Sequence, residues 1–208
     1  MNTSPGPSDA AAQWNKRFAE DDFLFGTEPN QWLRDHAGVL PSGGRVLCVA
    51  DGEGRNSVFL AQRGFVVDAF DISNVAIAKA QQFAAASGVT VTYQLADCDS
   101  FSWQPGAYDG VVAIFVQFAD PALRSRMFAR IIESLKPGGI LVLQGYTPKQ
   151  LEYKTGGPSN VDHLYTEAML RDAFAQLSIL ESKAYENDIT EGTGHRGRSA
   201  LIGMVARR

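Results

Sequence analysis

The chain has 208 residues, of which 45% are hydrophobic and 20% are charged, and its formal net charge is -4 at pH 7. This length fits one domain that buries its own core. The 19 Lys and Arg residues are scattered and are outnumbered by 23 Asp and Glu residues, so the sequence carries no basic patch of the kind that binds nucleic acid. A small molecule is therefore the expected partner, and the sequence does not indicate an oligomeric state.

Cysteine content and hydropathy predict a cytoplasmic protein without a membrane partner. Cys48 and Cys98 are its two cysteines, the first residues do not form a basic and then apolar leader, and no apolar run approaches the roughly 18 residues of a membrane span. Residues 1–11 have little to bury and are predicted to be a disordered tail. A single domain is expected over residues 12–208.

Residues 12–44 are predicted to form helices that act as an N-terminal lid. Trp14 and Phe18 are four residues apart, which places them on one face of a helix. Further aromatic residues follow in and after a turn, over residues 23–32. Two roles remain open for this aromatic segment: a flap that closes over a ligand, or ordinary packing of a peripheral helix.

From Arg45 onward, short apolar runs alternate with helical patterns, which is typical of a parallel sheet with helices on its faces. The predicted strands are rich in Val, Ile, Leu and aromatic residues, as buried strands are. They are residues 46–50, 65–71, 89–95, 110–116 and 140–146. The predicted helices are residues 55–63, the segment between its N-cap Ser73 and Gly88, and the segment from Pro121 to Pro137, which is capped by Asp120.

The C-terminal part departs from this alternation. Residues 147–165 are polar and contain Gly and Pro, so they are predicted to be a loop or lid, and a short helix follows Thr166. Two further strands, residues 177–188 and 198–206, are joined by ITEGTGHRG, which is too short for a crossover helix. The predicted fold is therefore α/β, a seven-stranded, mostly parallel, doubly wound (Rossmann-like) sheet with an antiparallel last strand, whose core is residues 45–208.

Ligands of such sheets bind beyond the carboxyl ends of the strands, where three features of this sequence meet. The stretch VLCVADGEGRNSVFLA joins a strand to a helix through a two-glycine turn, which leaves backbone N–H groups free for a ligand. Asp71 ends the second strand, where a carboxylate can accept hydrogen bonds from ribose hydroxyls. Asp97 follows the third strand, where it could accept one from an adenine amine. A helix-capping role for Asp71 and a turn role for Asp97 are the structural alternatives.

The two-glycine turn favours S-adenosylmethionine over a dinucleotide. It lacks the third glycine of G-x-G-x-x-G, because Ser57 stands at that position. Asp51 and Glu53 flank the turn, so a pyrophosphate would meet two carboxylates at a cost on the order of 1 to 4 kcal/mol for each contact. S-adenosylmethionine instead brings an ammonium and a sulfonium, together with one carboxylate for the backbone N–H groups. A solvated side chain is the alternative interpretation of Glu53.

Several stretches resemble the class I S-adenosylmethionine-dependent methyltransferases, from Trp14 to the last strand. The stretches WNKRF, FGTEPNQWL, VADGEGRNSVFLAQRG, LKPGG, TGGP and EGTGHRG are most similar to the tellurite-resistance and thiopurine methyltransferase-like branch of small-molecule enzymes. The resemblance implies detoxification-like methylation of a small molecule. Many of these enzymes bind the cofactor ammonium with a carboxylate late in the first strand. Cys48 stands at that position here, so Asp51 or a main-chain carbonyl would have to replace it.

The resemblance also implies cofactor contacts at the glycine turn, at Asp71, at Asp97 with Cys98, and near Phe115. The N-terminal helix adds Arg17, which could meet the cofactor carboxylate. The expected cofactor-binding residues are Trp14, Arg17, Ala50, Asp51, Gly52, Glu53, Gly54, Arg55, Asn56, Asp71, Ile72, Asp97, Cys98, Asp99, Phe115 and Gln117. No metal site is expected.

Methyl transfer from a sulfonium is an in-line displacement that needs alignment, exclusion of water and, for a poor nucleophile, a base. Gln117, after the fourth strand, is expected nearest the methyl group, where it can orient an acceptor but cannot remove a proton. The segment IFVQFADP around it lacks the Asn/Asp-Pro-Pro-aromatic tetrad with which enzymes methylate nucleic-acid amino groups. The other catalytic candidates are Tyr146, His163 and His195, for which packing or an exposed loop position is the alternative.

The absence of an evident strong base favours an acceptor that is itself nucleophilic. A thiol is a few per cent thiolate near neutral pH, so a thiol or heavier chalcogen acceptor is predicted. The alternatives are O- or N-methylation of a small metabolite, an S-adenosylmethionine-binding protein without catalysis and, ranked last, a nicotinamide-dependent oxidoreductase.

Overall fold

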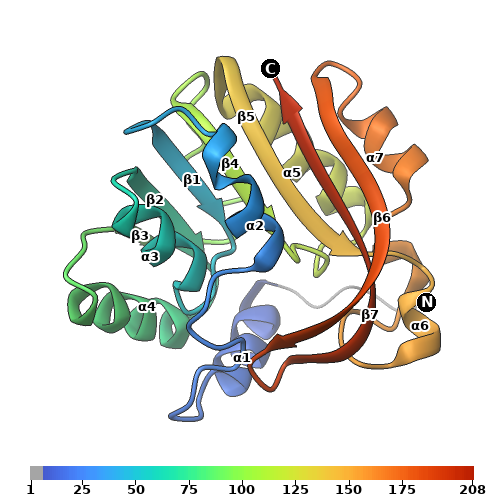
Figure 1. The fold of residues 1–208 in the computed structure, drawn as a ribbon. Helices are drawn as coiled ribbons and strands as arrows, with labels where there is room; N and C mark the ends of the chain where they lie inside the picture. The colour runs from blue at the N-terminus through green and yellow to red at the C-terminus, as the bar shows by residue number, and fades with distance from the viewer. Residues whose placement is uncertain (1–6) are drawn as a thin grey trace.

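A computed structural model describes residues 7–208 of the chain, which form a seven-stranded sheet of order β3-β2-β1-β4-β5-β7-β6 (Figure 1). The strands are β1 (Arg45–Val49), β2 (Val66–Asp71), β3 (Thr92–Leu95), β4 (Tyr108–Ile114), β5 (Leu135–Tyr146), β6 (Ser178–Glu191) and β7 (His195–Arg207). Strands β1 to β5 pair in parallel, and β7 runs antiparallel to both β5 and β6. The predicted Rossmann-like sheet with an antiparallel last strand is confirmed.

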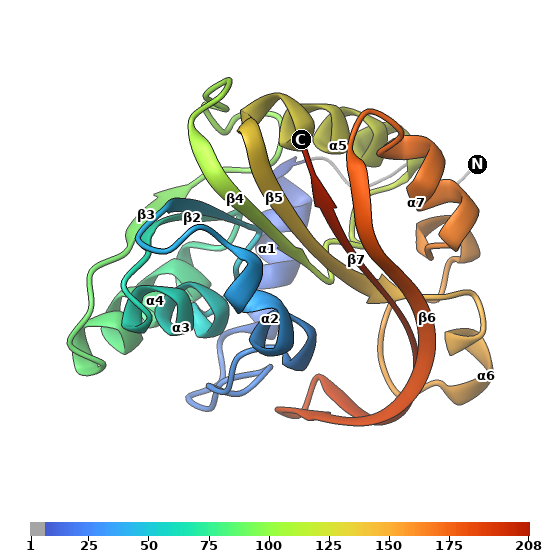
Figure 2. The ribbon, with the colours of Figure 1, turned by 45° about the horizontal axis from the view of Figure 1, so that its top comes forward.

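Helices cover both faces of this sheet. They are α1 (Pro7–Arg17), α2 (Gln31–His36), α3 (Arg55–Gln62), α4 (Asn74–Ala86), α5 (Pro121–Ser134), α6 (Gln150–Tyr153) and α7 (Glu167–Ala173), with 3-10 turns η1 (Ala37–Val39) and η2 (Val161–His163). Helices α2, α3 and α4 lie on one face, and α5 and α7 lie on the other (Figure 2). Ser73, Asp120 and Thr166 cap α4, α5 and α7 by accepting a backbone N–H of the first turn with their side chains.

Each face of the sheet has its own apolar layer. Successive strand residues point to opposite faces, so Leu47 and Val49 pack on the side of α5, whereas Val46 and Cys48 pack on the side of α3. Because both faces are buried, the central strands are continuous apolar runs rather than alternating ones, and the pattern could be recognised from the sequence. Among residues 7–208, no helix combines the length and apolarity needed to cross a membrane.

Two predicted boundaries in the outer parts of the chain are wrong. Helix α1 begins at Pro7, so residues 7–11 are helical rather than part of a disordered tail, and residues 1–6 lie outside the described residues. The predicted loop, residues 147–165, contains α6 and η2. Short helical turns of this kind lack an amphipathic repeat long enough to be seen in a sequence.

The hairpin formed by β6 and β7 is longer than predicted. Most of ITEGTGHRG belongs to the strands, because β6 continues to Glu191 and β7 begins at His195. The N-terminal segment supports this extension, since the Gly194 N–H donates to the Leu24 carbonyl at 2.9 Å. In Figure 1, α1 and the end of the hairpin both lie below the carboxyl ends of the parallel strands. The expected ligand edge is therefore covered by α1 and the hairpin.

Candidate functional site

A cavity of about 690 Å³ lies at the carboxyl ends of the parallel strands, between the glycine turn, α1 and the hairpin tip. Its lining includes all four predicted catalytic candidates: Gln117, Tyr146, His163 and His195. It also includes every predicted cofactor-binding residue except Glu53 and Gly54. The structure thus brings both predicted sets to one site.

The glycine turn at the start of the cavity is tied to β2 by Asp71. One carboxylate oxygen of Asp71 accepts the Gly52 N–H at 2.9 Å, and the other accepts the Ser73 N–H at 2.8 Å. Burial raises the pKa of Asp71, and these two backbone hydrogen bonds oppose the increase. Each carboxylate oxygen retains a second lone pair. The side chain can therefore hold the turn and still accept hydrogen bonds from a ligand's hydroxyl groups.

Glu53 and Gly54 are predicted ligand contacts that the structure places behind the turn, outside the cavity lining. Glu53 is buried, lies 2.5 Å from the Lys79 Nζ, and accepts the Leu24 N–H at 2.8 Å. Gly54 has φ of 90°, and a Cβ at this position would lie 2.8 Å from the Tyr93 hydroxyl oxygen. The charge argument against a pyrophosphate therefore loses Glu53, whose carboxylate is neutralised by Lys79.

Asp51 keeps an unusual place in the same turn. Its side chain is partly buried at the cavity wall, and its Oδ2 is buried without a hydrogen-bond partner within residues 7–208. Burial raises the pKa of Asp51 to about 7. Hydrogen bonding from Ser57 lowers this pKa, and the negative charge of the nearby Asp71 raises it further. The neighbouring Cys48 is a neutral thiol, because burial raises its pKa well above the usual value. Asp51 can thus change its charge near neutral pH, whereas Cys48 cannot replace a carboxylate.

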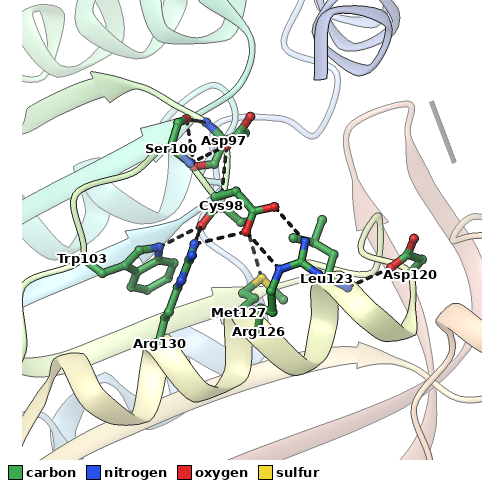
Figure 3. Close-up of polar contacts among 10 residues, drawn as sticks. Asp97, Cys98, Ser100, Trp103, Asp120, Leu123, Arg126, Met127 and Arg130 are labelled. Atoms are coloured by element: carbon green, nitrogen blue, oxygen red, sulfur yellow. Dashed lines mark hydrogen bonds and ion pairs between the residues drawn. The ribbon is translucent and has the colours of Figure 1, made fainter. Parts of the chain in front are cut away.

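The loop after β3 forms another edge of the cavity, and Asp97 closes it as a turn. The Asp97 Oδ1 accepts the backbone N–H groups of Asp99 at 2.9 Å and of Ser100 at 2.6 Å (Figure 3). These two bonds give Asp97 the structural role that was the alternative to adenine binding. They leave Oδ2 outside the turn, so both roles are compatible.

The same loop is anchored to α5 through its next two residues. The Cys98 carbonyl accepts hydrogen bonds from the Trp103 indole at 2.9 Å and from Arg130, while Asp99 pairs with Arg126 at 2.8 Å (Figure 3). Burial raises the pKa of the Cys98 thiol to about 12, so this thiol is not reactive at neutral pH. Cys98 therefore contributes its backbone and its packing to the cavity wall.

Aromatic rings line the other end of the cavity. The His195 ring centroid lies 4.5 Å from that of Phe25, 4.4 Å from that of Phe115 and 5.6 Å from that of Tyr146. Phe115 has φ of 56°, a left-handed conformation that is costly for a bulky residue and recurs at functional sites. The Tyr146 phenol stays neutral, because burial raises its pKa. We call these four residues the aromatic box.

Gln117 lines the cavity, and its side-chain amide holds the backbone beside the aromatic box. Its Nε2 donates to the carbonyls of Tyr146 at 2.9 Å and His163 at 3.0 Å, and its Oε1 accepts the Tyr146 N–H at 2.6 Å. Both amide donors are therefore in use. His163 returns a bond from Nδ1 to the Gln117 carbonyl at 3.0 Å. Because a carbonyl can only accept, this nitrogen of His163 carries a hydrogen.

Glu191 is a site residue that sequence reasoning missed. It pairs with His195 across the hairpin register, its Oε2 lies 2.7 Å from the guanidinium of Arg55, and its Oε1 accepts the Asn30 side-chain N–H at 2.9 Å. Although burial alone would raise the pKa of Glu191, the nearby His195 ring and the charge and hydrogen bond of Arg55 lower it to about 2. The only signal in the sequence was its position four residues before His195 in EGTGH.

The comparison with known proteins agrees with this geometry. Residues 46–139 match the model of a family described as a methyltransferase domain. This segment of the chain is therefore similar to the domain of that family. Asp71 and Asp97 both lie at the end of the cavity that contains the turn, and both retain acceptor lone pairs. Within residues 7–208, no group of three or more His, Cys, Asp or Glu residues is placed to hold a metal ion.

The chain is also similar to curated proteins over part of its length. The ubiquinone biosynthesis O-methyltransferase of Azoarcus sp. (strain BH72) is 31% identical over 148 residues, which are 67% of this chain and 62% of that protein. The chain thus spans less than two thirds of the length of this relative.

Two solved structures share the fold. TehB from Haemophilus influenzae has a TM-score of 0.71 and 19% identity, and the match covers 95% of this chain and 66% of that one. The N-methyltransferase NodS from Bradyrhizobium japonicum WM9, in complex with S-adenosyl-L-homocysteine, has a TM-score of 0.70 and 15% identity over 95% of this chain and 97% of that one.

Proposed function

We propose that the chain is an enzyme that transfers the methyl group of S-adenosylmethionine to a small-molecule acceptor bound in the aromatic box. The observation that carries this proposal is the single cavity whose two ends differ in chemistry. The glycine turn, Asp71 and Asp97 provide polar acceptors at one end, and Phe25, Phe115, Tyr146 and His195 form an aromatic enclosure at the other. A cofactor that spans the cavity would present its methyl group to the box.

The residues around the cofactor have distinct proposed tasks. Asp71 would accept the ribose hydroxyls, and Asp97 Oδ2 would accept the adenine amine. Arg17 stacks on the Trp14 ring with its guanidinium carbon 4.4 Å from the ring centroid, and it lies at the cavity wall where it could meet the cofactor carboxylate. When bound, the cofactor supplies an electrophilic methyl group on a sulfonium. The aromatic box excludes water from that group and aligns the acceptor with it.

A thiol or heavier chalcogen is the proposed acceptor, which would place the enzyme in the tellurite-resistance and thiopurine methyltransferase-like branch. The apolar rings of the box suit a soft, weakly hydrated nucleophile better than a strongly hydrated hydroxyl. The fold similarity to TehB is in keeping with this assignment. A detoxification role and a cytoplasmic location belong to the same proposal, since Cys48 and Cys98 are both free and buried.

O-methylation is the second candidate, and one comparison favours it. The relative from Azoarcus acts as an O-methyltransferase in ubiquinone biosynthesis. At neutral pH a phenol needs a general base to become a good nucleophile, whereas a thiol depends less on a base because a few per cent of it is already thiolate. The two candidates therefore differ in how strongly the rate depends on a proton-accepting side chain.

Binding experiments test the proposed cofactor, and turnover experiments test the proposed acceptor. Calorimetry should show binding of S-adenosylmethionine and S-adenosylhomocysteine but not of NADH, and the variant Asp71→Asn should bind both adenosyl compounds more weakly. The matched control Asp109→Asn changes a carboxylate that pairs with Lys136 outside the cavity, and it should bind them as the wild type does.

Incubation with aromatic thiols, selenite and phenols should yield S-adenosylhomocysteine with the thiols and selenite. Methylation of phenols alone would replace the thiol assignment with the O-methylation candidate. Binding of the cofactor without product from any acceptor would support a binding protein without catalysis. Tight binding of NADH without the adenosyl compounds would overturn the proposed function.

A further inference from the structure

A buried ion pair lies directly behind the aromatic box. The Glu191 and Arg55 side chains are 10% and 7% exposed, and their charged groups are 2.7 Å apart. Moving two charges from water into the protein interior costs desolvation free energy, which can exceed the attraction between them. A buried ion pair is therefore weak evidence that the pair stabilises the fold. Both partners are held in place by further bonds, from Asn30 to Glu191 at 2.9 Å and from Arg55 to the Phe25 carbonyl at 3.2 Å. The carboxylate of Glu191 is thus fixed in position by two residues that are distant in the sequence, Asn30 and Arg55.

This carboxylate faces one nitrogen of the His195 ring. The distance from Glu191 Oε2 to His195 Nδ1 is 3.7 Å, and Nδ1 has no hydrogen-bond partner within residues 7–208. The distance is longer than a hydrogen bond, as catalytic bonds often are before substrates arrive. A carboxylate can only accept, so the favoured tautomer has its hydrogen on Nδ1. The lone pair is then on Nε2, the opposite nitrogen of a ring that lines the cavity.

We propose that Glu191, anchored by Arg55 and Asn30, is a positioning residue that holds His195 in the tautomer able to remove the acceptor's proton. This inference rests on the proposed function and gives the catalytic candidate His195 the role of a base. His195 becomes the catalytic residue, because its Nε2 would touch the acceptor. Glu191 acts through His195 and stabilises the imidazolium that forms.

The charges around His195 agree with this assignment. Burial lowers the pKa of His195, the Glu191 carboxylate raises it, and the guanidinium groups of Arg55 and Arg17 lower it. The remaining titratable group against the ring is the Tyr146 phenol, which stays neutral because burial raises its pKa. His195 is therefore a neutral imidazole at neutral pH and can accept a proton.

The step balances for a thiol acceptor. His195 Nε2 takes the thiol proton and becomes an imidazolium whose charge faces Glu191. The freed sulfur lone pair forms a bond to the methyl carbon, and the electron pair of the broken carbon–sulfur bond remains on the departing thioether. The products are the methyl thioether, S-adenosylhomocysteine and one proton, which His195 later releases to water. No oxidant or metal ion is needed for this sequence.

Histidine NMR on the protein without ligands tests the geometry apart from any activity. Long-range ¹H–¹⁵N spectra across a pH titration, with rings assigned through the variants His195→Asn and His163→Asn, should show the His195 ring with its hydrogen on Nδ1. In Glu191→Gln this preference should weaken and the pKa of His195 should fall further. The control Glu186→Gln, on the same strand but paired with Lys149 and Arg198 at the surface, should leave both unchanged. A His195 ring with its hydrogen on Nε2, unaffected by Glu191→Gln, would overturn the proposal.

Turnover with thiols of graded acidity tests the chemical role. His195→Asn should lower kcat by about 10²- to 10⁴-fold for a weakly acidic benzyl thiol and much less for an acidic nitrothiophenol that is already ionised. Glu191→Gln should show the same pattern with a smaller loss, and Glu186→Gln should show none. Equal losses for both thiols would contradict the role of a base.

Two further measurements separate failure of this proposal from other failures. Glu191→Gln leaves Arg55 as an unpaired buried charge, so the double variant Arg55→Gln with Glu191→Gln removes both charges. If the single variant does not fold, the double variant should fold and still lose the tautomer preference; retention of the preference would count against Glu191. If no acceptor is methylated although S-adenosylhomocysteine binds, the proposed function fails while the NMR result still decides the position of the proton.

Discussion

The buried carboxylate of Asp51 should make the protein less stable as the pH rises. Burial raises its pKa from 3.8 to about 7 in the folded chain, whereas an unfolded chain ionises it at the ordinary value. Between these two values the unfolded state has lost this proton and the folded state has kept it. The unfolded state binds fewer protons at this site, so the free energy of unfolding falls across this window and levels off above pH 7.

The magnitude follows from the size of the shift. A change from 3.8 to about 7 is about 3 units, and each unit corresponds to about 1.4 kcal/mol, which gives about 4 kcal/mol as an upper bound. Asp51→Asn is neutral at every pH and should escape this loss. The amide could leave one buried polar atom without a partner, which costs about 1 to 3 kcal/mol. The net gain of the variant at pH 8 should therefore be about 1 to 3 kcal/mol.

Urea unfolding of wild type and Asp51→Asn at a series of pH values between 4 and 9 measures this difference. The stability of the variant relative to wild type should rise with pH and stay constant above pH 8. The control Asp109→Asn should differ from wild type by a nearly constant amount over this range, because a hydrogen bond from Lys136 lowers the pKa of Asp109, so its contribution is lost only below the ordinary pKa of 3.8. A constant difference between wild type and Asp51→Asn over the whole range would refute the reasoning.

Three further substitutions test the support of the cavity. Gly54→Ala should lower the free energy of unfolding in urea by about 1 to 3 kcal/mol. The φ of 90° is unfavourable for a residue with a side chain, and the new Cβ would lie 2.8 Å from the Tyr93 hydroxyl. An unchanged unfolding midpoint would contradict this packing. Ala50→Gly should gain about 1 kcal/mol at the left-handed φ of 48°, and a loss would show that this conformation costs little. Gln117→Ala should lose about 1 to 3 kcal/mol in thermal unfolding, since it removes the partner of the Tyr146 backbone N–H and of the His163 carbonyl, whereas the Tyr146 carbonyl keeps the Tyr165 N–H. Calorimetry should show nearly unchanged S-adenosylhomocysteine affinity; loss of affinity without loss of stability would instead support a direct role in the site.

The order of strands and helices could be predicted from the sequence because each element carries its own local signal. Buried parallel strands are continuous apolar runs, and the helices begin at residues such as Ser73 and Asp120 whose side chains cap them. Once the strands are placed in a doubly wound sheet, their carboxyl ends must share one edge. That constraint alone brings Asp71 and Asp97 to the same cavity as the glycine turn.

The roles of individual polar side chains were decided by partners far away in the chain. The sequence predicts that Glu53 contacts the ligand, whereas in the structure Glu53 forms an ion pair with Lys79 of the next helix. The sequence predicts that Gln117 has a free amide, whereas in the structure this amide donates to the Tyr146 carbonyl. Glu191 is 136 residues from Arg55, so no local pattern joins them. The charge, pKa and orientation of a carboxylate depend on its burial and on the groups that face it. Burial and facing groups are determined only when the sheet, the N-terminal segment and the hairpin pack together.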